Sequence, residues 1–195
     1  MIDERFVILG AILNLIGSAS YAYATIKGKT KPNRVTWFLW ALAPLIAFSA
    51  SIKDGVGLSA LMTFMVGFGP LIVFISSFIN KKSFWKISKL DVICGIISIV
   101  ALVLWLMTSS GVLAISLSII ADLVAGIPTL IKAYKVPESE GSSYVFTFGA
   151  ISAVITLLAL PKFEFSYYAF PIYIFLICVV LAVLIQFPKL RIAKR

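Results

Sequence analysis

Long blocks of apolar residues constrain this chain more than any other feature of its sequence. The blocks approach the roughly 20 residues that a helix rising 1.5 Å per residue needs to cross a bilayer. Of the 195 residues, 61% are hydrophobic and 13% are charged, whereas about a quarter of an average soluble domain is charged. The sequence therefore predicts a polytopic membrane protein.

We predict seven membrane-spanning α-helices. A membrane-spanning strand must belong to a closed barrel, whose sequence alternates between apolar and polar residues, and these blocks do not alternate. The helices are expected at Phe6–Ile26, Val35–Ser51, Val56–Ile79, Val92–Thr108, Val112–Ile131, Tyr144–Leu160 and Phe165–Phe187.

The lysines and arginines predict how the spans are oriented. With the N-terminus outside the cell and the C-terminus in the cytoplasm, fourteen basic residues fall in cytoplasmic segments and three fall outside. This asymmetry is typical of a plasma-membrane protein. The net charge of +9 thus reflects topology, and we expect no nucleic-acid partner. The cytoplasmic set is Lys27, Lys29, Lys31, Arg34, Lys81, Lys82, Lys86, Lys89, Lys132, Lys135, Lys189, Arg191, Lys194 and Arg195; the outer set is Arg5, Lys53 and Lys162.

Few residues suit a metal site or a disulfide. The chain has no histidine, which is the commonest metal ligand. Cys94 and Cys178 both lie inside apolar blocks, where we expect free buried thiols. The opening MIDERF has no basic stretch ahead of the first apolar block, so no cleaved signal peptide is expected. We predict no metal and no cofactor.

The spans divide into two groups of three around one linking span. Two parallel copies of a three-helix unit need an extra span between them to restore the direction of the chain. We therefore predict repeats at 1–80 and 112–195, joined by a basic loop and a linker helix at 81–111. An Ile-Lys pair and a later proline mark each copy: Ile26, Lys27 and Pro32 align with Ile131, Lys132 and Pro137.

With this plan, the chain resembles the PQ-loop superfamily, which includes the SWEET sugar transporters and lysosomal amino-acid exporters. The matching segment is Pro128, Thr129, Leu130, Ile131 and Lys132, where the family pattern reads Pro-Gln, two apolar residues and Lys. Thr129 replaces the Gln, and the first copy, YATIK, keeps only the Lys. The resemblance implies parallel three-helix repeats and transport of a small solute by alternating access.

Prolines inside the predicted helices are candidate hinges. Pro44 and Pro128 interrupt their helices and free backbone carbonyls, and the resemblance implies that they gate the pathway. Tyr23 and Ile151 lie near the other two hinge places of the family. Pro70 is a further candidate for bending the third span, with a plain packing kink as the alternative.

Asp122 is the only acid well inside a predicted span. It lies about ten residues, or roughly 15 Å, into its helix, and an ionisable group at that depth usually faces a cavity or a partner. Because lipid disfavours the charged form of a carboxyl, such a group suits proton coupling. The alternative is a protonated carboxyl that ties two helices together by hydrogen bonds.

Two stripes of small and polar residues recur at helical spacing, one in each copy. They predict either a shared central pathway or close packing of helices, for which small residues are also favoured. The stripes are Asn14, Ser18, Tyr21 and Thr25 in the first span and Asp122, Ala125, Gly126 and Thr129 in the fifth.

Two tryptophans open the second span. We expect Trp37 to be an interfacial anchor and Trp40, one turn deeper, to line a cavity, where an aromatic face suits a sugar ring or a cation. The resemblance to SWEETs implies asparagines beside the sugar in the third and seventh spans. Those spans offer Thr63, Tyr173 and Cys178 instead, which disfavours a sugar.

The leading functional hypothesis is a small-solute carrier with a sugar, an amino acid or a similar polar metabolite as substrate, proton-coupled through Asp122. The alternative is a non-transporting receptor or scaffold of the PQ-loop type; no catalytic constellation supports an enzyme. We expect membrane lipid as a partner, and the sequence leaves open whether the chain forms a homo-oligomer. The predicted binding residues are Asn14, Ser18, Trp40, Thr63, Asp122, Thr129 and Tyr173, and the predicted gating residues are Tyr23, Pro44, Pro70 and Pro128.

Overall fold

The computed structural model describes residues 2–53, 60–108, 110–160 and 162–187. In these ranges the chain forms seven α-helices and one 3-10 helix, and no strand. The number of helices agrees with the prediction. The helices are α1 (Phe6–Ile26), α2 (Arg34–Lys53), α3 (Ala60–Ile79), α4 (Lys89–Met107), α5 (Gly111–Lys135), η1 (Pro137–Glu140), α6 (Tyr144–Leu158) and α7 (Phe165–Gln186). The basic residues predicted for the cytoplasmic tail, Lys189, Arg191, Lys194 and Arg195, lie outside the described ranges.

Polar residues extend two helices beyond their predicted apolar limits. α4 begins at Lys89 because Ser88 and Asp91 form a capping box, each side chain accepting a hydrogen bond from the other residue's backbone N–H. α5 continues to Lys135, where basic side chains favour the negative end of the helix dipole. Apolarity alone cannot locate these ends, because caps and charged last turns are polar.

Within the described residues, five helices are long and apolar enough to cross a membrane, namely α1, α3, α4, α5 and α7. The apolar stretches Arg34–Phe48 in α2 and Tyr144–Leu158 in α6 are shorter. The 15 residues of α6 extend about 22 Å, less than the roughly 30 Å hydrocarbon core of a bilayer. The fold is therefore that of an all-α membrane protein, in which α6 is the shortest of the seven α-helices that the structure describes.

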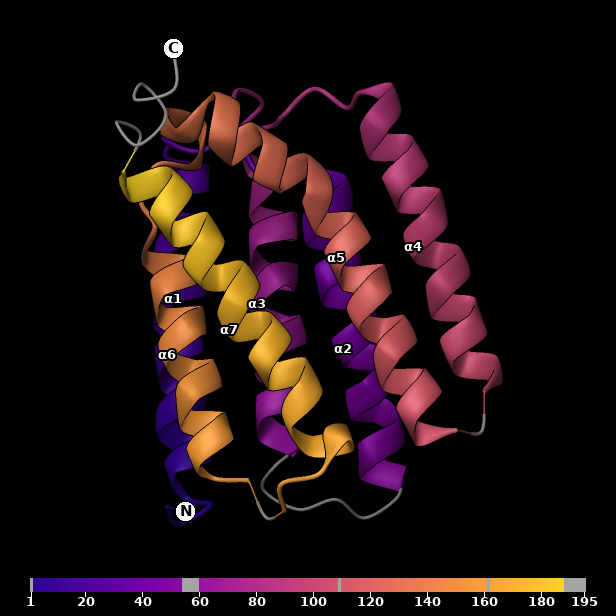
Figure 1. Ribbon diagram of the computed structural model, residues 1–195. Helices are drawn as coiled ribbons and strands as arrows, with labels where there is room; N and C mark the ends of the chain where they lie inside the picture. The colour runs from indigo at the N-terminus through magenta and orange to yellow at the C-terminus, as the bar shows by residue number, and fades with distance from the viewer. Residues whose placement is uncertain (1, 54–59, 109, 161, 188–195) are drawn as a thin grey trace.

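The helices pack side by side in one bundle (Figure 1). α3 packs against both α1 and α2, and α7 packs against both α5 and α6. α1 also packs on α6, and α2 on α5. α4 packs mainly on α5, with a smaller contact to α2, and lies at the edge of the bundle.

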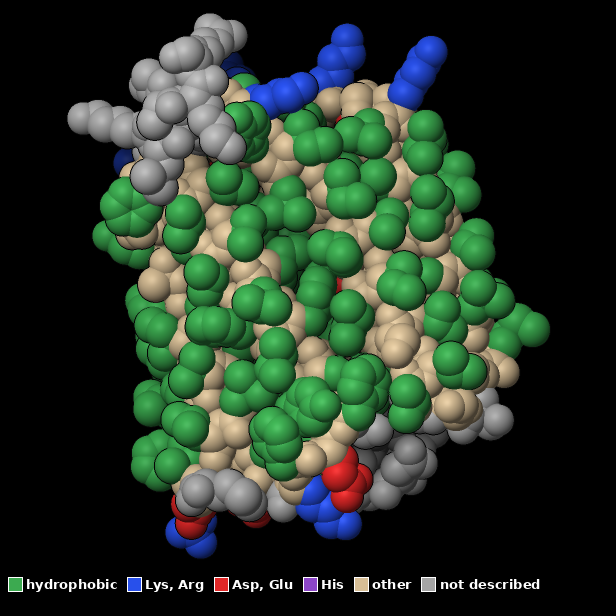
Figure 2. Space-filling model, in the orientation of Figure 1, with side chains coloured by type: hydrophobic (Ala, Val, Ile, Leu, Met, Phe, Trp, Pro, Cys, Tyr) green, Lys and Arg blue, Asp and Glu red, His purple; other side chains and the backbone are tan. Residues whose placement is uncertain are grey.

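The two ends of the bundle differ in charge, and hydrophobic side chains cover the face between them in Figure 2. One end, here called the basic end, carries the α1–α2 loop, the α3–α4 loop and the α5–α6 connection. Its exposed lysines include Lys27, Lys29, Lys31, Lys81, Lys82 and Lys86. The opposite end, here called the N-terminal end, exposes both signs of charge, including Asp3, Glu4, Arg5, Lys162 and Glu164.

An aromatic cluster fills the core toward the basic end. The Trp37 ring centroid lies 5.0 Å from that of Tyr21, 5.5 Å from Trp40 and 6.2 Å from Phe146. Trp37 is only 2% exposed, so its prediction as an interfacial anchor is wrong. Trp37 does lie near the end of α2, as predicted. Its side chain is on the face of α2 that meets Tyr21 of α1 and Phe146 of α6.

Both cysteines are free thiols, as predicted. Cys94 is buried in α4, and Cys178 is partly buried in α7.

Candidate functional site

A cavity of about 380 Å³ lies in the half of the bundle nearer the N-terminal end. This volume falls within the roughly 300–1,000 Å³ of typical small-molecule sites. All seven α-helices contribute to its wall, which also includes the aromatic side chains of Trp105 and Phe170. Its polar lining comes from Asn14, Thr63, Ser118, Asp122, Ser152 and Thr156.

A second, narrower cavity of about 80 Å³ lies between this space and the aromatic cluster. Asn14 and Asp122 line both cavities. Trp37, Trp40 and Cys178 line only the narrower one. Asp122 therefore lies where the wide cavity meets the narrow one, near the middle of α5.

Three helices fix the position of Asp122. The Tyr173 hydroxyl of α7 donates a hydrogen bond of 2.6 Å to the Asp122 Oδ2 atom. The Trp40 Nε1–H of α2 donates to the Asp122 backbone carbonyl at 3.1 Å. One turn along α5, a Cβ on Gly126 would come within 3.1 Å of both Trp40 and Ile177. The absence of a side chain there lets α2 and α7 approach α5 at the level of the carboxyl.

Asp122 is the only charged residue among the described residues that line the two cavities. Asp122 is 7% exposed. In the same region the buried Oδ1 atom of Asn14 and the Nε1 atom of Trp37 have no hydrogen-bond partner within the described part of the chain. Unpaired polar atoms beside a cavity cost free energy unless a ligand or water satisfies them.

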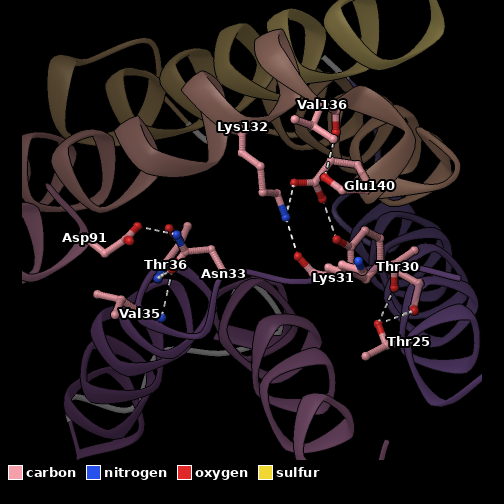
Figure 3. Close-up of polar contacts among 12 residues, drawn as sticks. Thr25, Thr30, Lys31, Asn33, Val35, Thr36, Asp91, Lys132, Val136 and Glu140 are labelled. Atoms are coloured by element: carbon pink, nitrogen blue, oxygen red, sulfur yellow. Dashed lines mark hydrogen bonds and ion pairs between the residues drawn. The ribbon is translucent and has the colours of Figure 1, made fainter. Parts of the chain in front are cut away.

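The basic end of the bundle is closed by a buried ionic cluster (Figure 3). The Lys132 Nζ atom lies 2.6 Å from Glu140 Oε1, and the two side chains are 1% and 0% exposed. The Tyr21 hydroxyl donates to Glu140 Oε2, and Lys132 Nζ donates to the Lys31 carbonyl at 2.5 Å. We call Tyr21, Lys31, Lys132 and Glu140 the Lys132 cluster; it joins α1, the α1–α2 loop, α5 and η1.

Further buried contacts surround the Lys132 cluster. The Lys31 backbone N–H donates to the Ser139 carbonyl at 2.7 Å, which pairs the α1–α2 loop with η1. The Asn33 Nδ2 atom donates to Asp91 at 2.5 Å, which fastens the same loop to α4. The Thr36 hydroxyl donates to the Ala125 carbonyl at 2.7 Å and joins α2 to α5. The bundle is thus hollow in one half and tightly connected in the other.

The structure brings most of the predicted binding residues together. Asn14, Trp40 and Asp122 surround the junction of the two cavities, with Ser18 in the narrow wall and Thr63 in the wide one. Tyr173 reaches the site through its bond to Asp122.

Other predicted residues lie elsewhere. Thr129 is fully buried but does not line either cavity. Of the gating candidates, Pro44 lines the wide cavity and Pro70 the narrow one. Pro128 lies inside α5, away from both lining sets. Tyr23 is 62% exposed and stacks only against Lys27, at 5.4 Å from the lysine nitrogen to the ring centroid.

Sequence reasoning missed several residues of the site. Ser118 lies one turn before Asp122, and Ser152 and Thr156 are one turn apart on α6, so helical spacing from Asp122 and a search for polar pairs would have found them. Glu140 gave no such signal, because a loop acid normally faces water. Lys132 was expected to face the cytoplasm but is buried against Glu140.

Comparisons of the chain with protein-family models, with curated proteins and with solved structures found no match.

Proposed function

We propose that the protein is a small-solute carrier of the plasma membrane that works by alternating access. The observation that carries this proposal is a cavity beside a buried carboxyl that lies toward the N-terminal end, while the Lys132 cluster closes the basic end. A carrier in one of its two end states needs this combination of an accessible binding site and a closed opposite gate.

The proposal includes two parallel three-helix units, α1–α3 and α5–α7, as in the PQ-loop superfamily. The packing supports it, because the third helix of each unit lies against both of the others. If the two units are equivalent, α5 corresponds to α1 and α6 corresponds to α2. The contact between α1 and α6 then corresponds to the contact between α5 and α2, and both contacts are present. The cavity lies between the two units, where rocking of one against the other would change its access.

We assign the basic end to the cytoplasm on the positive-inside rule. The cavity then faces the outside, and the Lys132 cluster acts as the cytoplasmic gate. Opening this gate separates η1 and α5 from α1 and the α1–α2 loop, and requires the Lys132–Glu140 pair to break or to move as a unit. The substrate is a small polar solute, because the cavity offers hydroxyl, amide and carboxyl groups on an otherwise apolar wall.

The second candidate function is a non-transporting receptor. The same cavity would bind a solute in that case, but the gate would stay closed and the solute would not cross. The polar atoms of Asn14 and Trp37 that lack partners favour ligand binding in either case.

Counterflow in proteoliposomes tests the carrier proposal. Vesicles containing the full chain and a high internal concentration of one unlabelled solute are diluted into its labelled form, across a panel of sugars, amino acids and amines. We expect saturable uptake of one solute class by the wild-type protein and none by protein-free vesicles. Binding of a solute without uptake would instead favour the receptor.

A further inference from the structure

The charge of the cavity indicates which class of solute it takes, an inference that rests on the proposed function. Asp122 is the only charged side chain among the described residues that line the two cavities. On the same helix, Lys132 lies about ten residues, or roughly 15 Å, nearer the basic end and is paired with Glu140. A solute in the cavity therefore meets one negative group and no positive one.

The described residues that the helices around Asp122 place in the cavity walls include no second carboxyl and no cation. α7 contributes two weakly acidic groups, the Tyr173 phenol that bonds Asp122 and the Cys178 thiol that lines the narrow cavity. α4 contributes Trp105, and the lining residues of α1, α2, α3 and α6 are uncharged. No internal counter-ion is therefore available to Asp122.

Asp122 is 7% exposed, and a carboxylate buried to this degree is unstable when ionised unless something neutralises it. Two species can do so, a proton or a bound cation. An anionic solute is repelled by Asp122, and a zwitterion leaves its own carboxylate without a partner. A cation is compatible with the rest of the wall as well, because Asn14 offers a buried acceptor and Trp40, Trp105 and Phe170 offer aromatic faces.

We propose that the substrate is a small organic monocation of the ammonium type, and that it exchanges for one proton at Asp122. When the cation binds, the carboxyl O–H bond breaks and the proton leaves to water on that side. When the cation departs on the other side, the carboxylate takes a proton from water there. One proton crosses in one direction for each cation in the other, so no net charge moves.

Matched solutes of different charge test this proposal. Choline is a permanent cation, glycine betaine is a zwitterion of similar size, and 3,3-dimethylbutanol is their neutral counterpart. Proteoliposomes containing the full chain and a trapped pH dye are loaded with one of the three and diluted into solute-free buffer. We expect outward choline movement to acidify the lumen, with no change for the other two solutes. Clamping the membrane potential with potassium and valinomycin should leave the rate unchanged, because the exchange is electroneutral.

Variants of Asp122 identify the exchanging group. Asp122→Asn should reduce choline-driven acidification at least about tenfold, since a buried charge partner is lost. Asp122→Glu keeps the charge and should retain measurable exchange. Glu138→Gln removes an exposed acid near the basic end and should behave as wild type. Size-exclusion chromatography checks that each variant is folded; if Asp122→Asn is not, the solute series and Asp122→Glu still decide the question.

The failures of the two proposals are distinguishable. Movement of glycine betaine or dimethylbutanol in place of choline, a choline flux that follows the membrane potential, or unaltered exchange in Asp122→Asn would overturn the cation–proton proposal and leave the carrier intact. If folded protein moves no solute of the counterflow panel, and does not move choline, the carrier proposal itself is overturned.

Discussion

Tyr173 and Asp122 form the contact on which the candidate site is centred. The phenol donates a 2.6 Å hydrogen bond to the carboxyl, and a hydrogen bond to a charged group contributes about 1.5–3 kcal/mol. This bond stabilises the ionised carboxylate that a bound cation requires. The apolar side chains of the wall determine the shape of the cavity.

We predict that Tyr173→Phe weakens the binding of a cationic solute by roughly tenfold or more, the change that about 1.5 kcal/mol produces. Isothermal titration with purified protein measures this affinity. Tyr167→Phe removes a phenol from the exposed side of the same helix and serves as the control. An unchanged affinity in Tyr173→Phe would show that the phenol does not support the site.

Lys132 and Glu140 form a buried ion pair, in which each side chain neutralises the charge of the other. Glu140→Gln leaves Lys132 buried without a counter-charge and also weakens the acceptor of Tyr21. Breaking such a pair costs about 3–5 kcal/mol. We expect a clear fall in the midpoint of thermal unfolding in detergent, compared with Glu138→Gln as the exposed control.

A double variant separates charge from packing in the Lys132 cluster. Replacing both members by apolar residues of similar size, as in Lys132→Met with Glu140→Leu, is often neutral or stabilising for buried pairs. We expect this variant to recover most of the thermal stability that Glu140→Gln loses. A double variant less stable than Glu140→Gln alone would mean that the charges themselves hold the basic end together.

At the scale of elements, α5 packs closely against α2 and α7 at the site. A Cβ at Gly126 would lie 3.1 Å from the side chains of both Trp40 and Ile177, so a larger side chain must displace these side chains or the helices that carry them. We predict that Gly126→Leu lowers the unfolding midpoint and weakens solute binding together. Leu123→Phe adds bulk to the exposed face of α5 and should change neither. Equal effects of both substitutions would contradict close packing at Gly126.

The elements were largely predictable from the sequence because bilayer-length apolar blocks leave few alternatives. α1 was predicted with the bounds it has, and Asp122, Ala125, Gly126 and Thr129 do share one buried face of α5. The partners of that face were not predictable. Tyr173 and Trp40 reach Asp122 from helices far along the chain, and no local spacing encodes which helix neighbours which.

The Lys132 cluster escaped prediction for a different physical reason. A lysine at the end of an apolar block usually extends its charge toward the aqueous interface, and Lys27 does so. In the proposed repeat, Lys132 aligns with Lys27 but is buried, because Glu140 in η1 supplies its counter-charge. The asymmetry depends on tertiary pairing of the α1–α2 loop with η1.

At the scale of the whole molecule, alternating access requires a cavity that opens to one side while the Lys132 cluster closes the other. Access of a thiol reagent to Asn14→Cys, in a protein with Cys94 and Cys178 replaced by alanine, tests this most directly, because Asn14 lines both cavities. In oriented vesicles, a membrane-impermeant reagent should label the cysteine from the N-terminal side only, and Glu140→Gln should add labelling from the basic side. Labelling from the basic side in the protein that retains Glu140, or labelling from neither side in both proteins, would contradict this one-sided access.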